Sequence, residues 1–355
     1  MTKREFLMLA HTYKQSKHGI GGWFWSEKLD GQRCFWDGGI TRDMPKSDVP
    51  WANTDKDDRL KDVQICTGLW SRYGNVIHAP GWWLNKLPAM LLDGELYMGR
   101  HSRQELMTII RPLVPNEDEW FMVKYHVFDM PSWGGFLQTG RINNPNFREK
   151  LIHKGMWQWV CDFLGAFNWH HYQEGPIQFR SVVTMMDRLI IDNEIVRRVE
   201  QHQLPFATHE AEEIIQIALE KICDIGGEGV MARSPDQAWE PKRVHGLVKL
   251  KKLQDAEAEV LGYVSGRQTD RGSKLLGLMG ALIVEYKEKQ FELSGFTDEE
   301  RGLLDYTGWC TSNPGSTVPE TILSDHFPRG SLVTFRYREL SKDGIPIEAR
   351  YWRKP

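Results

Sequence analysis

The sequence lacks any hydrophobic run long enough to cross a membrane. A transmembrane helix needs about 20 consecutive apolar residues, and this chain contains no such stretch. Residues 1–10 alternate charged and apolar side chains and form no continuous apolar segment. We therefore expect no signal peptide and no membrane partner.

The sequence also has few cysteines, and they are scattered. The five are Cys34, Cys66, Cys161, Cys223 and Cys310. No two form the Cys-x-x-Cys spacing typical of structural zinc sites, and their positions do not indicate a disulfide framework. A reducing compartment is therefore expected, which favours a cytoplasmic protein.

The chain has no overall excess of positive charge. It holds 45 Lys and Arg residues against 48 Asp and Glu residues, for a formal net charge of −3. Any binding to nucleic acid must therefore depend on local basic patches. Residues 324–355 form one such patch, because seven basic and four acidic residues leave a local charge of +3. The other interpretation of this segment is a solvated strand face.

The length of 355 residues suits two domains better than one. The side-chain pattern changes near residues 252–255. Beyond that point short alternating strands are expected at 257–264, 279–287, 290–295, 331–338 and 347–353. Five strands in about 100 residues are typical of a small antiparallel barrel such as the OB-fold. We predict domains at 1–252 and 253–355.

The larger domain mixes strand and helix patterns, which predicts an α+β fold. Two strands around a turn are expected over 20–40, and another strand pair over 89–98 around the turn dipeptide Asp93-Gly94. The other expected elements are strands at 121–129, 228–232 and 246–252, and helices at 147–165 and 208–223. Residues 144–174 are interpreted as an aromatic-rich helical insertion, used for local packing or for an additional DNA or partner contact.

Six short segments of the larger domain contain lysines, arginines, carboxylates and glycines in a characteristic order. They are Glu27-Lys28-Leu29-Asp30-Gly31-Gln32-Arg33, Ser71-Arg72-Tyr73-Gly74-Asn75, Asp93-Gly94-Glu95, Phe128-Asp129, Glu228-Gly229-Val230-Met231 and Leu247-Val248-Lys249-Leu250-Lys251. A lone lysine before a turn is usually a solvated surface residue. The complete ordered set favours a single chemical site instead.

This ordered set resembles the motifs of the covalent nucleotidyltransferase superfamily of DNA ligases, RNA ligases and mRNA capping enzymes. Longer strings resemble small ATP-dependent DNA ligases of bacteria and their phages, namely SEKLDGQRCFWDG, SRYGNVIHAPGWW, LLDGELYMGR, GGEGVMAR and FRYREL. The resemblance covers nearly the whole chain and thins over 140–205. It implies an ATP-grasp-like adenylation domain of antiparallel sheets and helices, followed by an OB-fold barrel, in the cytoplasm of a bacterial or phage-infected cell.

The chemistry of ligation explains why a lysine belongs with several cations. The first step is attack of an amine on the α-phosphorus of ATP, which releases pyrophosphate. A lysine amine has an ordinary pKa of about 10.4 and attacks only after losing its proton. Burial and nearby cations lower such a pKa. Arg33, Lys249, Lys251 and a bound Mg²⁺ are expected to supply that positive field and to neutralise the phosphoryl oxygens.

The resemblance implies one role for each residue that matches a motif around the nucleotide. Lys28 is the expected nucleophile, and Glu27 lies where the family contacts adenine. Arg33 is expected to bind the ribose or the phosphate of AMP, and Glu95 to hold the ribose hydroxyls. Phe128 is expected to stack on the adenine face, a contact worth about 1–3 kcal/mol where bases stack on aromatic rings.

Four further roles concern phosphates and metal. Glu228 is expected to bind Mg²⁺ or Mn²⁺ through oxygen, and Lys249 and Lys251 to hold the α-phosphate. Arg72 is expected to contact the 5′-phosphate of a nick. Since no cysteine cluster, helix-hairpin-helix pattern or further C-terminal module is visible, ATP is favoured over NAD as the cofactor.

The second domain is expected to bind the backbone of nicked duplex DNA, with the chain acting as a monomer. The expected contacts are Arg267, Arg271, Arg336 and Arg338. Residues 265–274 form only a short basic loop where some related viral ligases carry a long latch, so we predict salt-sensitive DNA binding. Arg350 and Arg353 lie in a segment that only partly matches the closing motif of the family and leave open a role with pyrophosphate.

Two other functions remain open from the sequence. One is an RNA ligase or a capping nucleotidyltransferase, which would share the covalent lysine chemistry. The other is a non-catalytic protein that binds DNA ends and has kept the fold, although the intact set of Lys28, Glu228, Lys249 and Lys251 argues against it.

Overall fold

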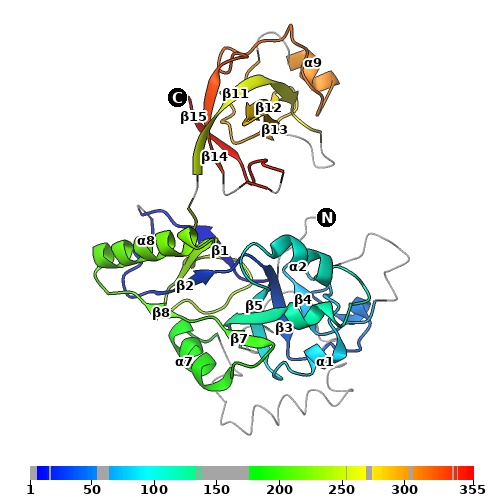
Figure 1. The fold of residues 1–355 in the computed structure, drawn as a ribbon, viewed down its shortest axis with the longest axis vertical. Coiled ribbons are helices and arrows are strands. Elements are labelled where there is room, and N and C mark those ends of the chain that lie inside the picture. The colour runs from blue at the N-terminus through cyan, green and yellow to red at the C-terminus, as the bar shows by residue number, and fades with distance from the viewer. Residues whose placement is uncertain are drawn as a thin grey trace. The chain divides into compact units, whose positions relative to one another are not determined.

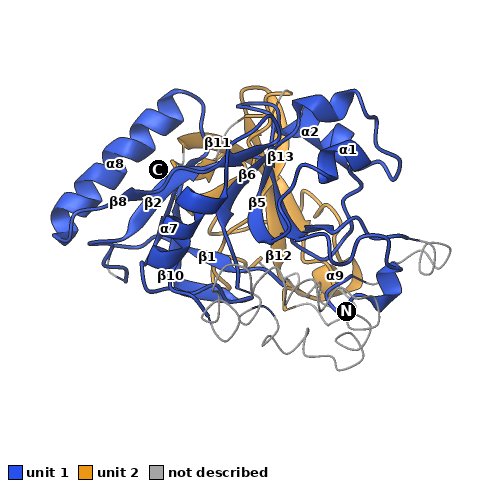
Figure 2. Ribbon diagram, turned by 90° about the horizontal axis from the view of Figure 1, so that it is seen from below, with its two compact units in different colours: residues 1–251 blue, residues 252–355 orange. Residues whose placement is uncertain are grey.

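The computed structural model describes residues 6–15, 17–53, 64–132, 136, 176–252, 254–268, 274–303, 307–337, 340–341 and 343–355. The expected helix at 147–165 and the insertion at 144–174 lie outside these residues. The chain forms two compact units, 1–251 and 252–355 (Figure 2). Within the described residues, no helix is long and apolar enough to cross a membrane.

The first unit contains two five-stranded sheets. One has the strand order β1-β10-β9-β2-β8. Its strands are β1 (Leu9–Thr12), β10 (Arg243–Leu250), β9 (Gly229–Arg233), β2 (Phe24–Lys28) and β8 (His202–Gln203). Neighbouring strands are antiparallel except for β1 and β10, which are parallel. The predicted strands at 228–232 and 246–252 are confirmed as β9 and β10.

Helix α8 (Thr208–Asp224) packs along this first sheet (Figure 1). Its apolar residues recur at the spacing of one helix face, and Ala211, Ile215 and Leu219 are buried against Val230 of β9 and Val248 of β10. The helix predicted at 208–223 is therefore confirmed.

The other sheet has the strand order β4-β3-β5-β6-β7. Its strands are β4 (Leu69–Ser71), β3 (Gln32–Asp37), β5 (Leu91–Tyr97), β6 (Lys124–Asp129) and β7 (Val196–Arg198). The helices that accompany it are α1 (Gly81–Leu84), α2 (Arg103–Ile110) and α7 (Phe179–Leu189), with 3-10 turns η1 (Lys46–Asp48) and η3 (Glu119–Met122). Strands β2 and β3 confirm the two strands predicted over 20–40, although they belong to different sheets and do not pair with each other.

A shared apolar core joins the two sheets of the first unit. Phe35 of β3 and Leu91 of β5 are buried in the same cluster as Val244 and Leu247 of β10. The turn between β2 and β3 crosses from one sheet to the other, so Lys28 and Arg33 lie on different sheets of the same core.

The predicted turn at Asp93-Gly94 is wrong. Both residues lie inside β5, where Asp93 pairs with Asp129 and Gly94 pairs with Val127 of β6. A Cβ atom on Gly94 would lie 2.5 Å from the carbonyl oxygen of His126. Glycine is therefore required here by the close approach of the neighbouring strand and not by a turn.

The second unit is a five-stranded antiparallel sheet of order β13-β12-β11-β14-β15. Its elements are β11 (Gln254–Ser265), β12 (Met279–Tyr286), β13 (Lys289–Leu293), α9 (Thr307–Ser312), β14 (Leu332–Tyr337) and β15 (Arg350–Arg353). All five predicted strands are confirmed. The edge strands meet just beyond β13, where the Tyr351 amide donates to the Ser294 carbonyl at 2.8 Å, so the sheet curls towards a barrel.

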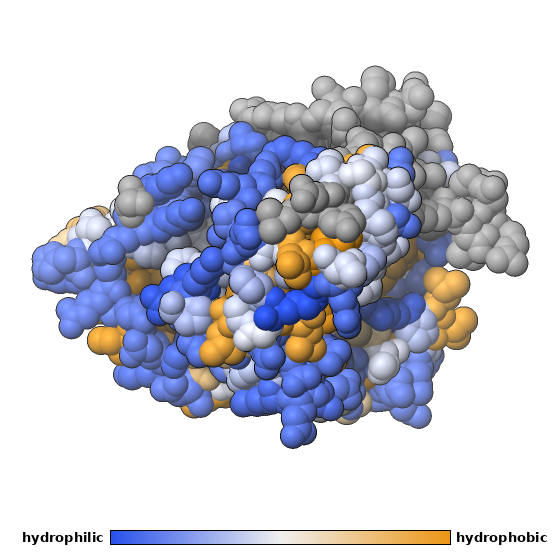
Figure 3. Space-filling view, turned by 90° about the horizontal axis from the view of Figure 1, so that it is seen from above, coloured by the Kyte–Doolittle hydropathy of each residue, from blue (hydrophilic) through white to orange (hydrophobic). Residues whose placement is uncertain are grey.

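The surface in Figure 3 is mostly hydrophilic, with hydrophobic side chains in separate patches. The second unit has its own buried apolar core, which includes Tyr263, Phe327 and Phe335. Each unit therefore has the buried core expected of an independently packed domain.

Candidate active site

Lys28 meets a carboxylate that lies far away in the sequence. It is the last residue of β2 and pairs with Gly229, the first residue of β9. This register brings Glu228, the residue before β9, to the lysine. The Lys28 ammonium group donates to one Glu228 oxygen, and Lys251 Nζ lies 2.5 Å from the other. The Glu228 side chain is only 5% exposed, so two lysines share one buried carboxylate.

Two glycines permit the close packing around this centre. A Cβ atom on Gly229 would lie 2.2 Å from the carbonyl oxygen of Leu250, which directly precedes Lys251. A Cβ atom on Gly31 would lie 2.1 Å from the carbonyl oxygen of Leu96 and 2.9 Å from Cγ of Glu95. Any larger residue at either position would push apart the strands that carry Glu228, Lys251 and Glu95.

The two carboxylates near Lys28 have opposite pKa shifts. Burial alone would raise the pKa of Glu228, but the positive charges of Lys28 and Lys251 outweigh burial and hold this pKa below its ordinary value. Burial raises the pKa of Glu95 to about 7, although Lys28 and Arg33 oppose the shift. Glu228 is therefore ionised at neutral pH, while Glu95 changes its charge there.

Arg33 is held by a buried carboxylate and an aromatic ring. Its Nε and Nη2 atoms donate to the two oxygens of Asp93 at 2.7 and 2.6 Å. The guanidinium carbon lies 4.8 Å from the centre of the Phe128 ring, a cation–π geometry. Asp93 also accepts a hydrogen bond from Trp239 Nε1 at 3.0 Å. Arg33, Phe128 and Glu95, predicted separately from the sequence, therefore come together on one sheet.

The other predicted phosphate-binding residues lie on the surrounding strands. Lys249 lies on β10, two residues before Lys251, which directly follows the strand. Lys249 pairs with Met231 of β9, and Met231 in turn pairs with Ser26 of β2. Side chains two apart on a strand share a face, so Lys249 lies on the Lys28 face of the sheet. Arg72 directly follows Ser71 of β4, and Ser71 pairs with Cys34, the neighbour of Arg33 on β3. The Arg72 guanidinium lies 5.6 Å from the centre of the Tyr73 ring.

Glu27 is not brought together with these groups. As the neighbour of Lys28 on β2 it points to the opposite face of the sheet, where its cross-strand partner Val230 packs under α8. Its carboxylate lies 2.9 Å from Nη2 of Arg100. The structure thus places the Glu27 side chain behind the strand, away from Arg33 and Phe128.

The donor set of the site fits a metal held by few protein ligands. Glu228 offers an ionised oxygen pair, and charge interaction links it to Glu95. Among the described residues no group of three or more His, Cys, Asp or Glu side chains could enclose a metal ion. Mg²⁺ is commonly bound by one or two carboxylates together with substrate phosphates and water, so Glu228 is the residue that could hold it.

Four of the arginines predicted to bind DNA belong to the second unit; two of these are described, and both have acidic partners. Arg267 is 71% exposed and lies 3.3 Å from Glu292. Arg336 lies 2.8 Å from Asp255 and 3.6 Å from the centre of the Trp352 ring. Arg271 and Arg338 fall outside the described residues. At the C-terminal strand, Arg350 donates to Ser294 Oγ at 2.5 Å, and Arg353 is exposed.

The sequence did not indicate the buried ionic network behind Arg33. Asp129 pairs with Arg233, and Asp129 also faces Asp93 across β5 and β6. The Arg233 guanidinium lies 4.0 Å from the centre of the Phe179 ring. One sequence signal could have indicated the continuous buried strand β5, namely the leucines at 91, 92 and 96 on either side of Asp93-Gly94.

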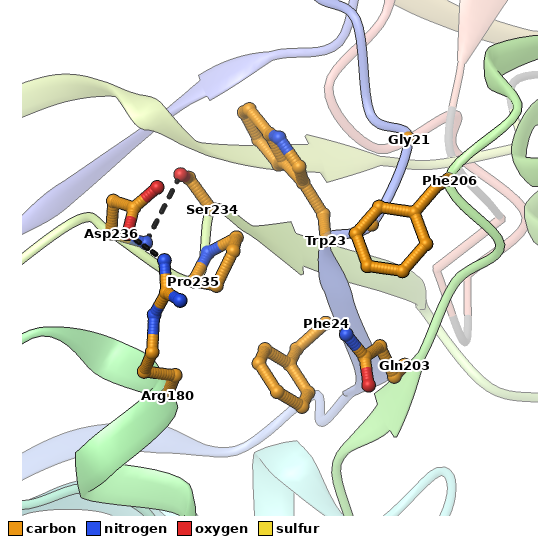
Figure 4. A pocket seen from close by; sticks show the side chains of 10 residues that line it. Gly21, Trp23, Phe24, Arg180, Gln203, Phe206, Ser234, Pro235 and Asp236 are labelled. Atoms are coloured by element: carbon orange, nitrogen blue, oxygen red, sulfur yellow. Dashed lines mark hydrogen bonds and ion pairs between the residues drawn. The ribbon is translucent and has the colours of Figure 1, made fainter.

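The structure also contains a hollow that none of the predicted site residues line (Figure 4). It lies beside Phe24, at the opposite end of β2 from Lys28. Its lining residues are Gly21, Gly22, Trp23, Phe24, Arg180, Gln203, Phe206, Ser234, Pro235 and Asp236. The rings of Trp23, Phe24 and Phe206 surround the space, and Arg180 is paired with Asp236 on its far side.

Comparisons with known proteins find DNA ligases. Residues 272–354 match the family of the DNA ligase OB-like domain. A DNA ligase of Haemophilus influenzae is 26% identical over 349 residues, which cover 98% of this chain and 91% of the relative. The expected resemblance to DNA ligases is therefore confirmed, together with the α+β fold followed by an OB-like domain.

Two solved structures are similar to nearly the whole chain. One from a structure–function study of Lig E DNA ligases is 25% identical, has a TM-score of 0.63 and covers 98% of both chains. A second, named Pmar-Lig, is 21% identical with a TM-score of 0.58, and the match covers 98% of this chain and 67% of that one. This second likeness concerns the fold alone.

Proposed function

We propose that this protein is an ATP-dependent DNA ligase that seals breaks between a 3′-hydroxyl and a 5′-phosphate in duplex DNA. The observation that carries the proposal is the pairing of Lys28 and Lys251 with the buried carboxylate of Glu228. A structural surface lysine does not need a second lysine and a nearly buried carboxylate. A lysine that becomes covalently attached to a phosphate does need both positive charge and a fixed orientation.

In the first step Lys28 is the nucleophile. The Lys28 ammonium group first loses a proton to solvent. The neutral nitrogen then forms a bond to the α-phosphorus of ATP, the bond from that phosphorus to the bridging oxygen breaks, pyrophosphate leaves, and the nitrogen releases a second proton to solvent. Lys249 and Lys251 hold the α-phosphate, and their charge stabilises the negative charge that develops on its oxygens. The product is AMP joined to Lys28 through a phosphoramidate bond.

The nucleoside part of ATP is held on the sheet of β3, β5 and β6. Glu95 accepts hydrogen bonds from the ribose hydroxyls, and Phe128 stacks on adenine. Because the Arg33 guanidinium covers the Phe128 ring at 4.8 Å, adenine stacks on the other face of that ring. Arg33 keeps its two hydrogen bonds to Asp93, and the part of its guanidinium that does not face Asp93 interacts with the ribose or the phosphate.

The later steps act on nicked duplex DNA. AMP moves from Lys28 to the 5′-phosphate, which Arg72 contacts, and the 3′-hydroxyl then displaces AMP. Arginines of the second unit bind the DNA backbone independently of base sequence. Glu228 would hold a divalent metal such as Mg²⁺ or Mn²⁺, which would supply further positive charge to the transferring phosphate.

The decisive test is labelling of the wild-type protein with α-labelled ATP or GTP, followed by denaturing electrophoresis. A covalent adduct with ATP and none with GTP supports the proposal, whereas labelling by GTP indicates a capping nucleotidyltransferase. Absence of any adduct, while a control ligase is labelled, indicates a non-catalytic DNA-binding protein. Duplexes with DNA or RNA on each side of the nick then separate DNA from RNA ligation.

A further inference from the structure

Two arginines of one neighbouring segment contact the chain before and after Lys28. Arg100 lies 2.9 Å from the carboxylate of Glu27, the residue before Lys28. Arg103 lies 3.4 Å from the carboxylate of Asp30 and donates to the carbonyl oxygen of Gly31 at 3.3 Å. Both arginines come from the turn and first helical residue that follow β5.

This turn has a fixed conformation of its own. The Ser102 hydroxyl donates to the Gly99 carbonyl at 2.7 Å, and His101 adopts a left-handed backbone with φ of 63°. The His101 ring packs so closely on Gly226 that a Cβ atom there would lie 2.4 Å from Nε2. A non-glycine residue with positive φ persists only when its surroundings enforce it. The turn is therefore a rigid support.

The helix that begins at Arg103 anchors the support to the core. In α2, Leu106, Ile109 and Ile110 are buried beside the sheet that contains β3 and β5. Arg103 thus extends from a well-packed element to the segment between β2 and β3, which has no regular structure of its own, and Arg100 extends to Glu27 at the end of β2. Asp30 and Gly31 in that segment depend on neighbouring groups for their position.

We propose that Arg100 and Arg103 are positioning residues that hold the Lys28 segment in place for attack on the α-phosphate of ATP. The proposal rests on the proposed ligase function. Neither arginine contacts the reacting atoms, and each acts through its partner, Glu27 or Asp30. Misplacement of a reacting group by about 1 Å can lower a rate by about 100-fold, so loss of either contact affects the chemical step.

A contact with DNA phosphates is the other use of two arginines in a ligase. The structure favours positioning because Arg100 and Arg103 each have a carboxylate partner from the Lys28 segment. The two contacts hold the residues on either side of Lys28 in place. This difference allows the two roles to be separated by experiment.

The test uses Arg100→Gln, Arg103→Gln and the conservative Arg100→Lys in the full-length protein. Two rates are measured, namely label transfer from α-labelled ATP at several ATP concentrations, and sealing of a nick that already carries 5′-AMP. Arg111→Gln is the matched control, because Arg111 is an exposed arginine at the other end of α2. The melting temperature of each variant is measured alongside.

The proposal predicts that both glutamine variants lower the maximal rate of label transfer by about 10- to 100-fold. The half-saturating ATP concentration and the sealing of pre-adenylylated nicks stay within about threefold of wild type, and Arg100→Lys recovers part of the rate. Arg111→Gln behaves as wild type. The double variant Glu27→Gln with Arg100→Gln has the same maximal rate of label transfer as Arg100→Gln alone, because both changes break the same contact.

Three results would overturn the proposal. A loss confined to the sealing of pre-adenylylated nicks would assign the arginines to DNA binding. Equal losses in both reactions with a lower melting temperature would assign them to stability only. Wild-type rates in both glutamine variants would leave the contacts without a role in catalysis. Failure of the ligase assignment is distinct, because neither wild type nor Arg111→Gln would then be labelled.

Discussion

Lys28 and Glu228 form an ion pair although 200 positions separate them in the sequence. The antiparallel register of β2 and β9 creates this contact, and Lys251 completes it on the other side of the carboxylate. The pair keeps the amine and the carboxylate oriented before any nucleotide binds. Preorganisation of this kind lowers the cost of aligning charges during phosphoryl transfer.

Lys28→Ala should abolish transfer of AMP from ATP to the protein, since it removes the nitrogen that forms the phosphoramidate. We expect label transfer to fall by more than about 1,000-fold, as removal of a covalent nucleophile does in other enzymes. Sealing of a pre-adenylylated nick should continue, although more slowly. Lys221→Ala, on the exposed face of α8, is the control. Full labelling of Lys28→Ala would contradict the assigned nucleophile.

Glu228→Gln should impair adenylylation. The amide has nearly the shape of the carboxylate but lacks its charge, so it neither balances Lys28 and Lys251 nor binds a divalent metal well. We expect about a 100-fold loss, equivalent to about 2.7 kcal/mol of barrier height, and a weaker response to added Mg²⁺. An unchanged Mg²⁺ titration of label transfer would argue against metal binding at Glu228.

Glu95→Gln should change how the stability of the protein depends on pH. Burial raises the pKa of Glu95 from 4.5 to about 7, so the folded protein binds this proton more tightly than the unfolded chain. Glu95 therefore makes the free energy of unfolding fall as pH rises from about 4.5 to about 7. Denaturant unfolding at several pH values in this window measures the free energy of unfolding of both proteins. The wild-type value minus the Glu95→Gln value should fall as pH rises. A difference independent of pH would refute it.

Asp93→Asn should destabilise the first unit strongly. Asp93 is fully buried and accepts from Arg33 and Trp239, and removal of one partner from a buried ion pair costs about 3–5 kcal/mol. Asp255→Asn is a matched control, because Asp255 pairs with Arg336 at the surface and such pairs contribute less than about 1 kcal/mol. Thermal unfolding of both variants measures the contrast, and equal effects would disprove the structural importance of Asp93.

Affinity for a nicked duplex should weaken steeply as salt concentration rises. Each phosphate contact contributes a slope of about −0.9 to the logarithm of the binding constant against the logarithm of salt concentration. Arg267→Gln should reduce the magnitude of the slope by about 1. Arg188→Gln, which removes an exposed arginine of α7, should leave the slope unchanged. A wild-type slope near zero would contradict electrostatic binding of the DNA backbone.

Local sequence patterns predicted most of the fold that the structure describes. The strands β11 to β15 follow from alternating apolar residues between glycine-rich turns, and α8 follows from its helical spacing. These patterns succeed because each element buries one face against a single core. The strand pair predicted around Asp93-Gly94 was wrong because a local turn signal was overridden by pairing of β5 with both β3 and β6.

The candidate site was predictable in its membership but not in its arrangement. The motif order assembled Lys28, Glu228 and Lys251 without any knowledge of register. The contact of Arg33 with Asp93, and the location of Glu27 on the opposite face from Lys28, depend on which strands lie side by side. Arg100 ends the LLDGELYMGR string and Arg103 lies outside every quoted string, and neither was assigned a role, because their partners become neighbours only after β2, β5 and α2 have packed together.

The sequence by itself determined which residue types are available to the chemistry and which segments become strands or helices, since periodicity and turn residues act within a few positions of the chain. Only the tertiary structure decided which charges share one carboxylate, which are buried in pairs and which support the lysine from behind. The physical reason is that charge interactions depend on distance and burial, and both are set by pairing between segments that are far apart in the chain.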